Sequence, residues 1–241
     1  MARPTRVDTH EELLTAIGAP RPGGRAIALV GGADLLAGSA RETMTGFFRT
    51  FVAALEAAGC AVVDGGTDSG VMRLIAEARR TARASFRLIG VAPRGRIDRP
   101  TRAGTIVRLA TGHTDLVLVP GESFGDETPW LFRAADHLAG GRAPTVVVNG
   151  GRLTLGEAIR RLTTGAPVVT VAGSGRAAEV LADAARAGGR LGPGSATGGG
   201  DGDELGPYPV ETVDVARLRV VGLDASIDGL TAALWAPVEE G

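Results

Sequence analysis

Glycine-rich turns with small polar side chains are the features of this chain that can do chemistry. The run V-V-D-G-G-T-D-S-G-V-M, residues 62–72, puts Gly65, Gly66 and Thr67 between an apolar run and an amphipathic segment. Glycine weakens a helix or strand by roughly 0.5–1 kcal/mol relative to alanine, so a close approach or an unusual turn must compensate. A glycine turn that opens a helix offers bare N–H groups at the positive end of the helix dipole. We interpret Gly65, Gly66 and Thr67 as a cradle for a phosphate or a carboxylate.

Comparable turns follow the other apolar runs. The residues in them that we expect to contact a ligand are Gly32, Arg94, Gly121, Gly173, Ser174, Gly175 and Arg176. Each turn alone is a weak signal, because a Gly-Gly pair at a strand end is often only a turn. Residues 173–178 fit G-x-G-x-x-A, but no acidic residue at a strand end follows about 20 positions later, so the dinucleotide-binding fingerprint is incomplete.

All 26 basic residues are arginine, and the chain has no lysine. This excludes a Walker-type phosphate loop, a Schiff-base enzyme and a lysine general base. Any positive charge in a site is therefore a guanidinium, which grips phosphates and carboxylates in bidentate fashion. Arg176 opens a predicted helix, where a cation is unfavourable beside the helix dipole, and this favours an anionic partner for it.

Composition narrows the class of protein further. The chain has 241 residues, 44% of them hydrophobic, and a formal net charge of −1, so we expect neither nucleic acid nor a membrane as partner. No apolar run approaches the roughly 18–20 residues of a membrane helix, and the first residues lack an apolar signal core, which predicts a cytoplasmic protein. One cysteine, Cys60, and three scattered histidines offer no metal site, and we expect no cofactor.

Short apolar runs alternate with amphipathic segments along most of the chain. Strands are predicted at 26–30, 61–63, 88–92, 116–119, 145–148 and 168–171, and helices at 39–58, 71–83, 130–138, 154–162 and 175–187. Two runs, Ser39 to Glu42 and Thr154 to Glu157, match the capping box that begins a helix. Runs of Val, Leu and Ile without alternation indicate strands buried on both faces, and their alternation with helices indicates parallel pairing. The predicted fold class is α/β, a Rossmann-like parallel sheet with helices on both faces.

We divide the chain into four segments. Residues 1–24 are predicted to form a loosely packed N-terminal arm with one short helix, and residues 25–187 the Rossmann-like domain. Residues 188–206 are rich in glycine and predict a flexible linker. Residues 207–241 form a C-terminal appendage, with a strand within 213–223 and a helix at 227–235, that is expected to dock on the main domain.

Ligands of open parallel sheets bind outside the carboxyl ends of the strands. We therefore expect the loops that contain Thr67 and Ser174, after the second and sixth predicted strands, to converge on one crevice. His113, His137 and Trp130 are interpreted as structural, and Asp64 as a residue that can hold its own turn through side-chain hydrogen bonds.

Four motifs occur in one order, namely G-G-T-D-S-G-V-M at 65–72, I-G-V-A-P at 89–93, G-D-E at 125–127 with L-F-R at 131–133, and G-S-G-R-A-A-E-V at 173–180. In these the chain resembles the SLOG superfamily, particularly the prokaryotic relatives of the cytosolic N-terminal domain of TRPM channels. The resemblance implies a Rossmann-like sensor domain whose pocket binds nucleotide derivatives, ADP-ribose among them, and it favours Arg133 as a ligand contact. The leading hypothesis is a binding module for an adenine-nucleotide or NAD-derived ligand.

The wider superfamily includes the Lonely-guy phosphoribohydrolases, which are marked by P-G-G-x-G-T-x-x-E. Here residues 120–129 read P-G-E-S-F-G-D-E-T-P, with an insertion, without the second glycine and the threonine, and with Pro129 at the expected glutamate. Glu127 can substitute for that glutamate, or Glu122 can stabilise an oxocarbenium-like state. The alternative hypothesis is therefore an N-glycosidic hydrolase that acts on a nucleotide.

Overall fold

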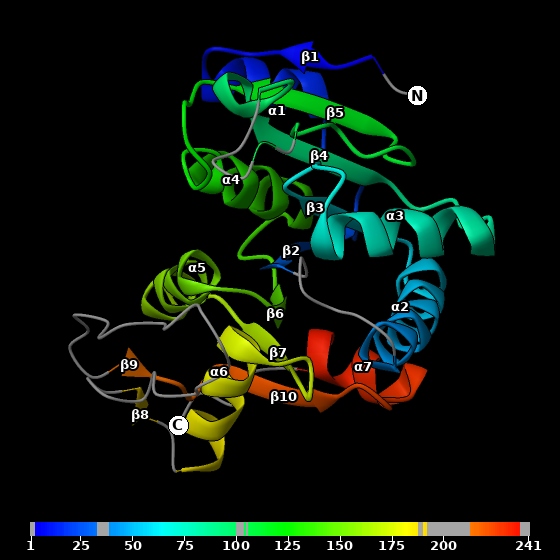
Figure 1. Cartoon of the computed structure of the whole chain (residues 1–241), viewed down its shortest axis with the longest axis vertical. Helices are drawn as coiled ribbons and strands as arrows, with labels where there is room; N and C mark the ends of the chain where they lie inside the picture. The colour runs from blue at the N-terminus through cyan, green and yellow to red at the C-terminus, as the bar shows by residue number, and fades with distance from the viewer. Residues whose placement is uncertain are drawn as a thin grey trace. The chain divides into compact units, whose positions relative to one another are not determined.

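A computed structural model describes residues 3–32, 39–99, 104, 106–187, 190–191 and 213–236. The chain forms two compact units (Figure 1). Unit 1 comprises Met1–Leu29 and Leu55–Ala143, and unit 2 comprises Val30–Ala54 and Pro144–Gly241.

Unit 1 is built on parallel strands in the order β1-β5-β4-β3-β2. The strands are β1 (Thr5–Arg6), β5 (Asp115–Val119), β4 (Leu88–Pro93), β3 (Cys60–Asp64) and the first residues of β2 (Arg25–Gly32). All six residues of β4 are buried, because helices cover both sides of the strands. This burial explains the uninterrupted apolar run of β4 in the sequence.

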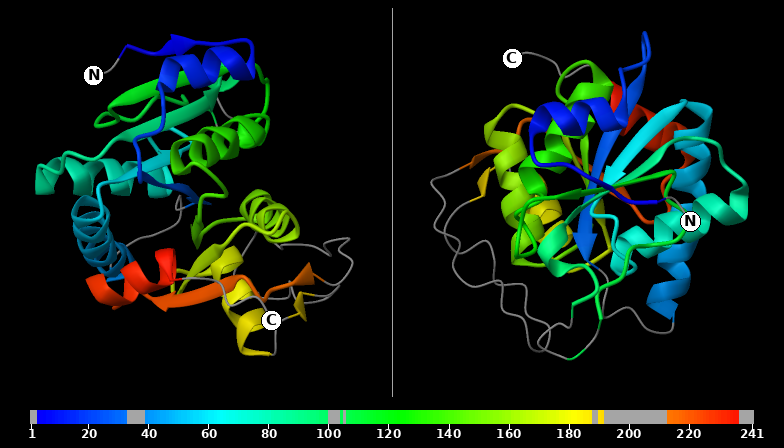
Figure 2. Two further views of the ribbon diagram at one scale, coloured as in Figure 1. Left: turned by 180° about the vertical axis from the view of Figure 1, so that it is seen from behind. Right: turned by 90° about the horizontal axis from the view of Figure 1, so that it is seen from above.

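The helices of unit 1 are α1 (His10–Ile17), α3 (Gly70–Ala82) and α4 (Thr128–Ala139), with the short 3-10 helix η1 (Arg94–Arg96). Helices α1 and α4 pack against each other on one side of the strands, and α3 lies on the other side (Figures 1 and 2). Pro129 lies in the first turn of α4, where its missing N–H costs no helical hydrogen bond.

Unit 2 has three parallel strands in the order β6-β7-β10, namely β6 (Thr145–Asn149), β7 (Val168–Ala172) and β10 (Leu218–Gly222). Its helices are most of α2 (Ser39–Ala57), α5 (Arg152–Thr163), α6 (Arg176–Arg186) and α7 (Ile227–Trp235). Helix α6 packs on β6, β7 and β10. A separate antiparallel pair joins β8 (Arg190–Leu191) to β9 (Val213–Asp214). The C-terminal strand β10 thus pairs directly with β7.

The predicted α/β class with Rossmann-like parallel strands is confirmed, and each predicted strand and helix lies within a few residues of its expected place. Two details were wrong. The N-terminal segment is not loosely packed, because β1 pairs with β5 and the apolar side chains Leu13 and Ile17 of α1 are at most 1% exposed. The run Thr154 to Glu157 is not a capping box, since α5 already begins at Arg152 and its N-cap is Gly151.

The four-segment division stays a prediction. Most of the predicted linker, residues 188–206, lies outside the described residues, and within it only Arg190–Leu191 are described, as a strand. The capping interaction expected at Ser39 also falls on side chains that are not described.

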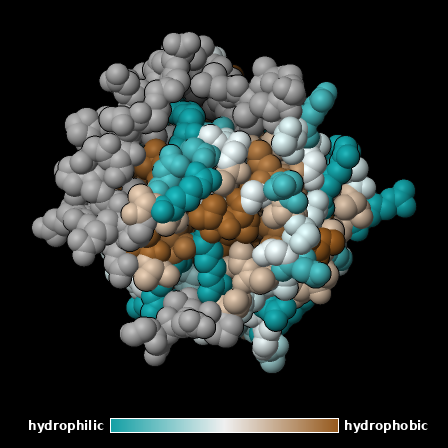
Figure 3. Space-filling model, turned by 90° about the horizontal axis from the view of Figure 1, so that it is seen from below, coloured by the Kyte–Doolittle hydropathy of each residue, from teal (hydrophilic) through white to brown (hydrophobic). Residues whose placement is uncertain are grey.

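Among the described residues, no helix combines the length and the apolar character that crossing a membrane requires. Figure 3 shows hydrophobic residues toward the middle of the face seen from below, with hydrophilic residues around and between them. The larger exposed apolar side chains of unit 2 include Leu153, Val220 and Ile227. Isolated exposed apolar residues of this kind are normal on a protein surface.

Candidate functional site

The turn after β3 is held by Asp64. Its Oδ1 accepts a hydrogen bond from the N–H of Gly66 at 2.7 Å, so Asp64 holds its own turn through its side chain. Gly66 has φ +64°, and a Cβ atom there would lie 2.9 Å from the Cα of Gly90 on β4. Position 66 therefore requires glycine, because strand β4 approaches it too closely to leave room for a side chain. The N–H of Gly66 is donated to Asp64, and the contact of Gly66 with a ligand stays a prediction.

Gly65 and Thr67 differ from Gly66 in their surroundings. A Cβ on Gly65 would meet only the side chain of Met72, at 3.8 Å, which is an ordinary van der Waals distance. Thr67 is buried, forms an isolated bridge to Leu109, and its hydroxyl lies 3.1 Å from that of Ser69. Packing explains Gly66 but leaves Gly65 open to a ligand.

Behind this turn, the imidazole of His113 and the carboxylate of Asp64 form a pair in which both side chains are fully buried. The Nε2–Oδ1 distance is 2.8 Å. Burial alone lowers the pKa of His113, but the charge and the hydrogen bond of Asp64 outweigh it, so that pKa is raised above its usual value. The second oxygen, Asp64 Oδ2, is buried without a hydrogen-bond partner. His113 is thus a structural histidine, as predicted, and it fixes the base of the Gly65 turn.

Arg94, at the end of β4, is turned toward the N-terminal segment. Its guanidinium donates to the carbonyl of Val7 at 2.8 Å and forms an ion pair with Asp8. These contacts hold the segment that leads into α1. One of its two terminal nitrogens, Nη2, is thus engaged within the protein, and the contact of Arg94 with a ligand stays a prediction.

The loop after β5 is tightly organised around Asp126. Its Oδ2 accepts the N–H groups of Glu122 and Ser123 at 2.9 and 3.0 Å. A Cβ on Gly121 would lie 2.6 Å from the Cβ of Asp126 and 3.0 Å from that of Pro93. Gly121 is therefore required by packing.

Glu127, at the end of the same loop, is 8% exposed, and its Oε2 accepts the N–H of Gly125 at 2.7 Å. Burial raises the pKa of this carboxyl, although backbone hydrogen bonds oppose the shift. A buried carboxyl with a raised pKa at a strand end is the kind of group that acts as a general acid.

Arg133 lies in the second turn of α4 and is exposed. It lines an open groove between α1 and α4 together with His10, Glu11 and His137. The Nε2 of His137 lies 3.0 Å from the carbonyl of Gly18, which agrees with a structural role. The ring of Trp130 packs on His10 at 4.2 Å between centroids. Arg133 is thus surrounded by α1 residues and by none of the glycine turns.

In unit 2, three strand ends meet. A Cβ on Gly32, at the end of β2, would lie 3.5 Å from the Cα of Gly150, which follows β6. The hydroxyl of Ser174, after β7, accepts the N–H of Asn149 at 2.8 Å and donates to the carbonyl of Val171 at 2.6 Å. The structure therefore brings together the turns after β2, β6 and β7. The hydroxyl of Ser174 links the turn after β7 to the end of β6.

Two non-glycine residues in these turns have left-handed backbone, Asn149 with φ +53° and Arg176 with φ +51°. The carbonyl oxygen of the Asn149 side chain is buried and has no hydrogen-bond partner among the described residues. Backbone strain of this kind costs about 1–3 kcal/mol per residue and clusters at functional sites. Asn149 was not among the predicted contacts. The available signal was an asparagine directly before Gly-Gly at a strand end, since asparagine tolerates left-handed backbone.

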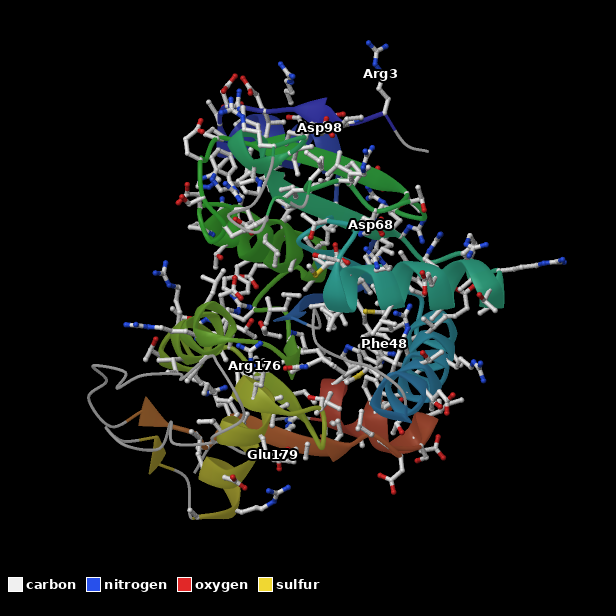
Figure 4. The ribbon with its side chains drawn as sticks, viewed as in Figure 1. Arg3, Phe48, Asp68, Asp98, Arg176 and Glu179 are labelled. Atoms are coloured by element: carbon white, nitrogen blue, oxygen red, sulfur yellow. The ribbon has the colours of Figure 1, made fainter. Side chains whose placement is uncertain are left out.

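In the turn after β7, the N–H of Gly173 is used within the part of the chain that the structure describes, and the N–H of Gly175 is not. The N–H of Gly173 donates to Glu179 Oε2 at 2.8 Å. Figure 4 labels Glu179 and Arg176, which both belong to α6. Gly175 has φ +92°, a Cβ there would meet nothing within 4 Å, and its N–H makes no hydrogen bond to another described residue. Gly175 is thus a predicted contact in this turn whose backbone N–H is not used by another described residue.

Within the described ranges, no group of three or more His, Cys, Asp or Glu side chains could hold a metal ion. Thr67 belongs to unit 1 and Ser174 to unit 2. A crevice shared by their two loops stays a prediction.

Parallel strands that alternate with helices and end in glycine turns define a Rossmann-like α/β domain. The model of the family described as "SLOG in TRPM, prokaryote" matches residues 25–224, and the chain belongs to that family. The resemblance identified from the motifs is thereby confirmed.

Two solved structures are similar in fold. The X-ray structure of TM1055, a structural genomics target, is 17% identical, covers 85% of this chain and 95% of its own, and has a TM-score of 0.50. A molybdenum cofactor binding protein from the phototrophic bacterium Rippkaea orientalis is 14% identical, covers 61% of this chain and 75% of its own, and has a TM-score of 0.43. A search of curated proteins found no match.

Proposed function

We propose that the protein is a ligand-sensing domain that binds a nucleotide derivative, an adenine-nucleotide or NAD-derived molecule such as ADP-ribose, at the strand ends of unit 2. The observation that carries the proposal is the orphaned side-chain oxygen of Asn149, buried beside two strained turns. A buried acceptor without a donor costs about 1–3 kcal/mol, and a ligand that supplies the donor recovers that cost.

The chemistry around Asn149 suits both ends of such a ligand. Its oxygen accepts a hydrogen bond from a base amino group or a ribose hydroxyl. The N–H of Gly175 and the guanidinium of Arg176 suit a phosphate at the start of α6, where the helix dipole also favours an anion. Gly32 leaves room for the ligand to approach the backbone, because a Cβ there would meet only ordinary contacts.

A thermal-shift panel of AMP, NAD and ADP-ribose tests the proposal. A ligand at about 100 times its Kd stabilises the protein by about 2.7 kcal/mol. For a chain of this size, 1 kcal/mol shifts the melting temperature by about 2–4 °C, so a true ligand raises it by about 5–11 °C. No shift with any of the three compounds at millimolar concentration would reject this class of ligand.

Arg176→Ala locates the site. Loss of a hydrogen bond to a charged group, about 1.5–3 kcal/mol, weakens ADP-ribose binding about ten-fold to a hundred-fold in calorimetry. The melting temperature without ligand stays the same or rises slightly, because a cation is removed from the helix N-terminus. Arg160→Ala is the matched control, since Arg160 lies exposed in the last turn of α5. Equal affinities for the two variants would remove Arg176 from the site.

A second function, hydrolysis of a nucleotide N-glycosidic bond, is favoured by one observation, the raised pKa of the buried Glu127 carboxyl. Burial, which raises the pKa of this carboxyl, favours its protonated form, and a protonated carboxyl can donate its proton to a leaving base. Release of free base or ribose phosphate from AMP, NAD or ADP-ribose, abolished by Glu127→Gln, would establish this function. Binding without release supports the sensor.

A further inference from the structure

Unit 1 has a pocket at the opposite edge of its strands from the glycine turns. The pocket has a volume of about 350 Å³ and is lined where β2, β3 and β4 begin, by Arg25, Ala61 and Arg87 among others. Parallel neighbouring strands begin at one edge of a sheet, and β3 alone, five residues long, separates the two edges by about 16 Å. The pocket is therefore separate from the strand-end turns, and the proposed function does not involve it.

Three guanidinium groups and one carboxylate line this pocket, those of Arg21, Arg25, Arg87 and Glu56. Arg21 is exposed, and its side chain makes no hydrogen bond or ion pair to a described residue. Arg87 forms the wall, since it donates to the carbonyl of Ile17 at 2.8 Å and pairs with Asp115 at 3.1 Å. Arg21 is thus the cation that remains available to a ligand.

The one carboxylate in the pocket is already satisfied by other donors. Glu56 accepts the N–H of Ser85 at 2.8 Å, the hydroxyl of Ser85 at 2.6 Å and the N–H of Phe86 at 2.9 Å. These bonds, with that of the Ser85 hydroxyl first, lower the pKa of Glu56. The backbone N–H groups of Ser85 and Phe86 hold the Glu56 carboxylate in place, and Arg21 makes no ion pair with it.

The size of the pocket limits the class of ligand. Small-molecule sites occupy about 300–1,000 Å³, so this pocket accommodates a small metabolite but not a dinucleotide. Guanidinium groups recognise phosphates and carboxylates through paired N–H donors. The lining also includes the buried ring of Phe86, which provides an apolar wall.

We propose that this pocket is a second binding site, for a small multiply charged anion that bears a phosphate or several carboxylates. Arg21 contacts the anion directly and Arg25 borders it. The site lies within unit 1 and shares no residue with the nucleotide site proposed in unit 2, so it gives the protein a means to respond to a second metabolite.

Calorimetry at low ionic strength, with pyrophosphate and citrate as probes and glycerol as the neutral control, tests the proposal and separates the phosphate source from the carboxylate source. At least one anion binds and glycerol does not. Amide signals of Gly24, Gly59 and Ser85 shift in nuclear magnetic resonance spectra on addition of that anion. Binding weakens as sodium chloride rises to 0.1 M, where the screening length is about 10 Å.

Arg21→Gln weakens the anion about ten-fold or more and leaves the melting temperature of the unliganded protein unchanged. Arg80→Gln is the control, because Arg80 is exposed on α3 outside the pocket and the charge change is the same. Arg176→Ala reports whether the anion binds at the nucleotide site proposed in unit 2. The proposal is overturned if neither anion binds, if Arg21→Gln and Arg80→Gln bind alike, or if Arg176→Ala rather than Arg21→Gln abolishes binding.

Discussion

Gly66→Ala is expected to destabilise unit 1 through its packing against β4. The new Cβ lies 2.9 Å from the Cα and 3.1 Å from the carbonyl carbon of Gly90, and 3.4 Å from the Leu116 side chain. Backbone atoms of a buried strand have little room to move. Overpacking a buried position costs about 1–3 kcal/mol.

The backbone conformation of Gly66 adds a second cost. At φ +64°, a residue with a Cβ pays roughly 1–2 kcal/mol for left-handed backbone. The two contributions give about 2–5 kcal/mol, which is a large part of the 5–15 kcal/mol that stabilises a typical protein. At about 2–4 °C per kcal/mol for a chain of this size, the melting temperature falls by about 4–20 °C.

Gly65→Ala is the matched control. Its Cβ meets only Met72 at 3.8 Å, so the unliganded protein changes by no more than about 0.5 kcal/mol. Each unit contains one tryptophan, Trp130 in unit 1 and Trp235 in unit 2. Fluorescence-monitored melting in a Trp235→Phe background therefore reports on the unit that contains the substitution.

Two results would refute this reasoning. If Gly66→Ala melts at the temperature of the parent, then the approach of Gly66 to Gly90 does not require glycine. If Gly65→Ala lowers the melting temperature as much as Gly66→Ala, then the room for a Cβ atom at each position does not determine the cost of the substitution.

Three further predictions concern titration and strain. Because the His113 pKa is raised, His113 stabilises the fold fully below about pH 6.5 and less as pH rises through the raised pKa. His113→Gln therefore lowers the melting temperature more at pH 6 than at pH 8. The raised pKa of Glu127 means that its ionisation costs stability. The melting temperature of Glu127→Gln, measured relative to that of the parent, is therefore higher at pH 8 than at pH 4.5. Asn149→Gly relieves left-handed strain and raises the melting temperature while weakening ADP-ribose in calorimetry.

The fold was predictable because its signals are local. Each parallel strand is a short apolar run, as in β4, and each helix has its own periodicity, as in α7, which lies at the predicted residues 227–235. The strand β1 was missed for a physical reason. Thr5 and Arg6 are polar, exposed residues, and they form a strand only because their backbone pairs with the edge strand β5.

The candidate site was predictable in position but not in detail. Glycine turns at strand ends are visible in the sequence, whereas the partner that each polar group takes depends on contacts across the sheet. Arg94 is a clear case, since its partner Val7 lies 87 positions away along the chain. Arg133 is another, because the packing of α4 on α1 decides what surrounds it.

Glycine at a strand end has two distinct causes that sequence alone does not separate. In one, protein atoms fill the space of the missing side chain, as at Gly66, Gly121 and Gly150, where a Cβ would lie 2.9 Å or less from a neighbour. In the other, a Cβ would fit without strain, with only ordinary van der Waals contact at Gly65 and open space at Gly175. Selection for folding explains the first kind completely. The second kind has no folding reason in open space unless its φ requires glycine, and at Gly65 the φ does not. Gly65, in the turn after β3, is therefore a strand-end glycine for which neither packing nor φ supplies a structural cause.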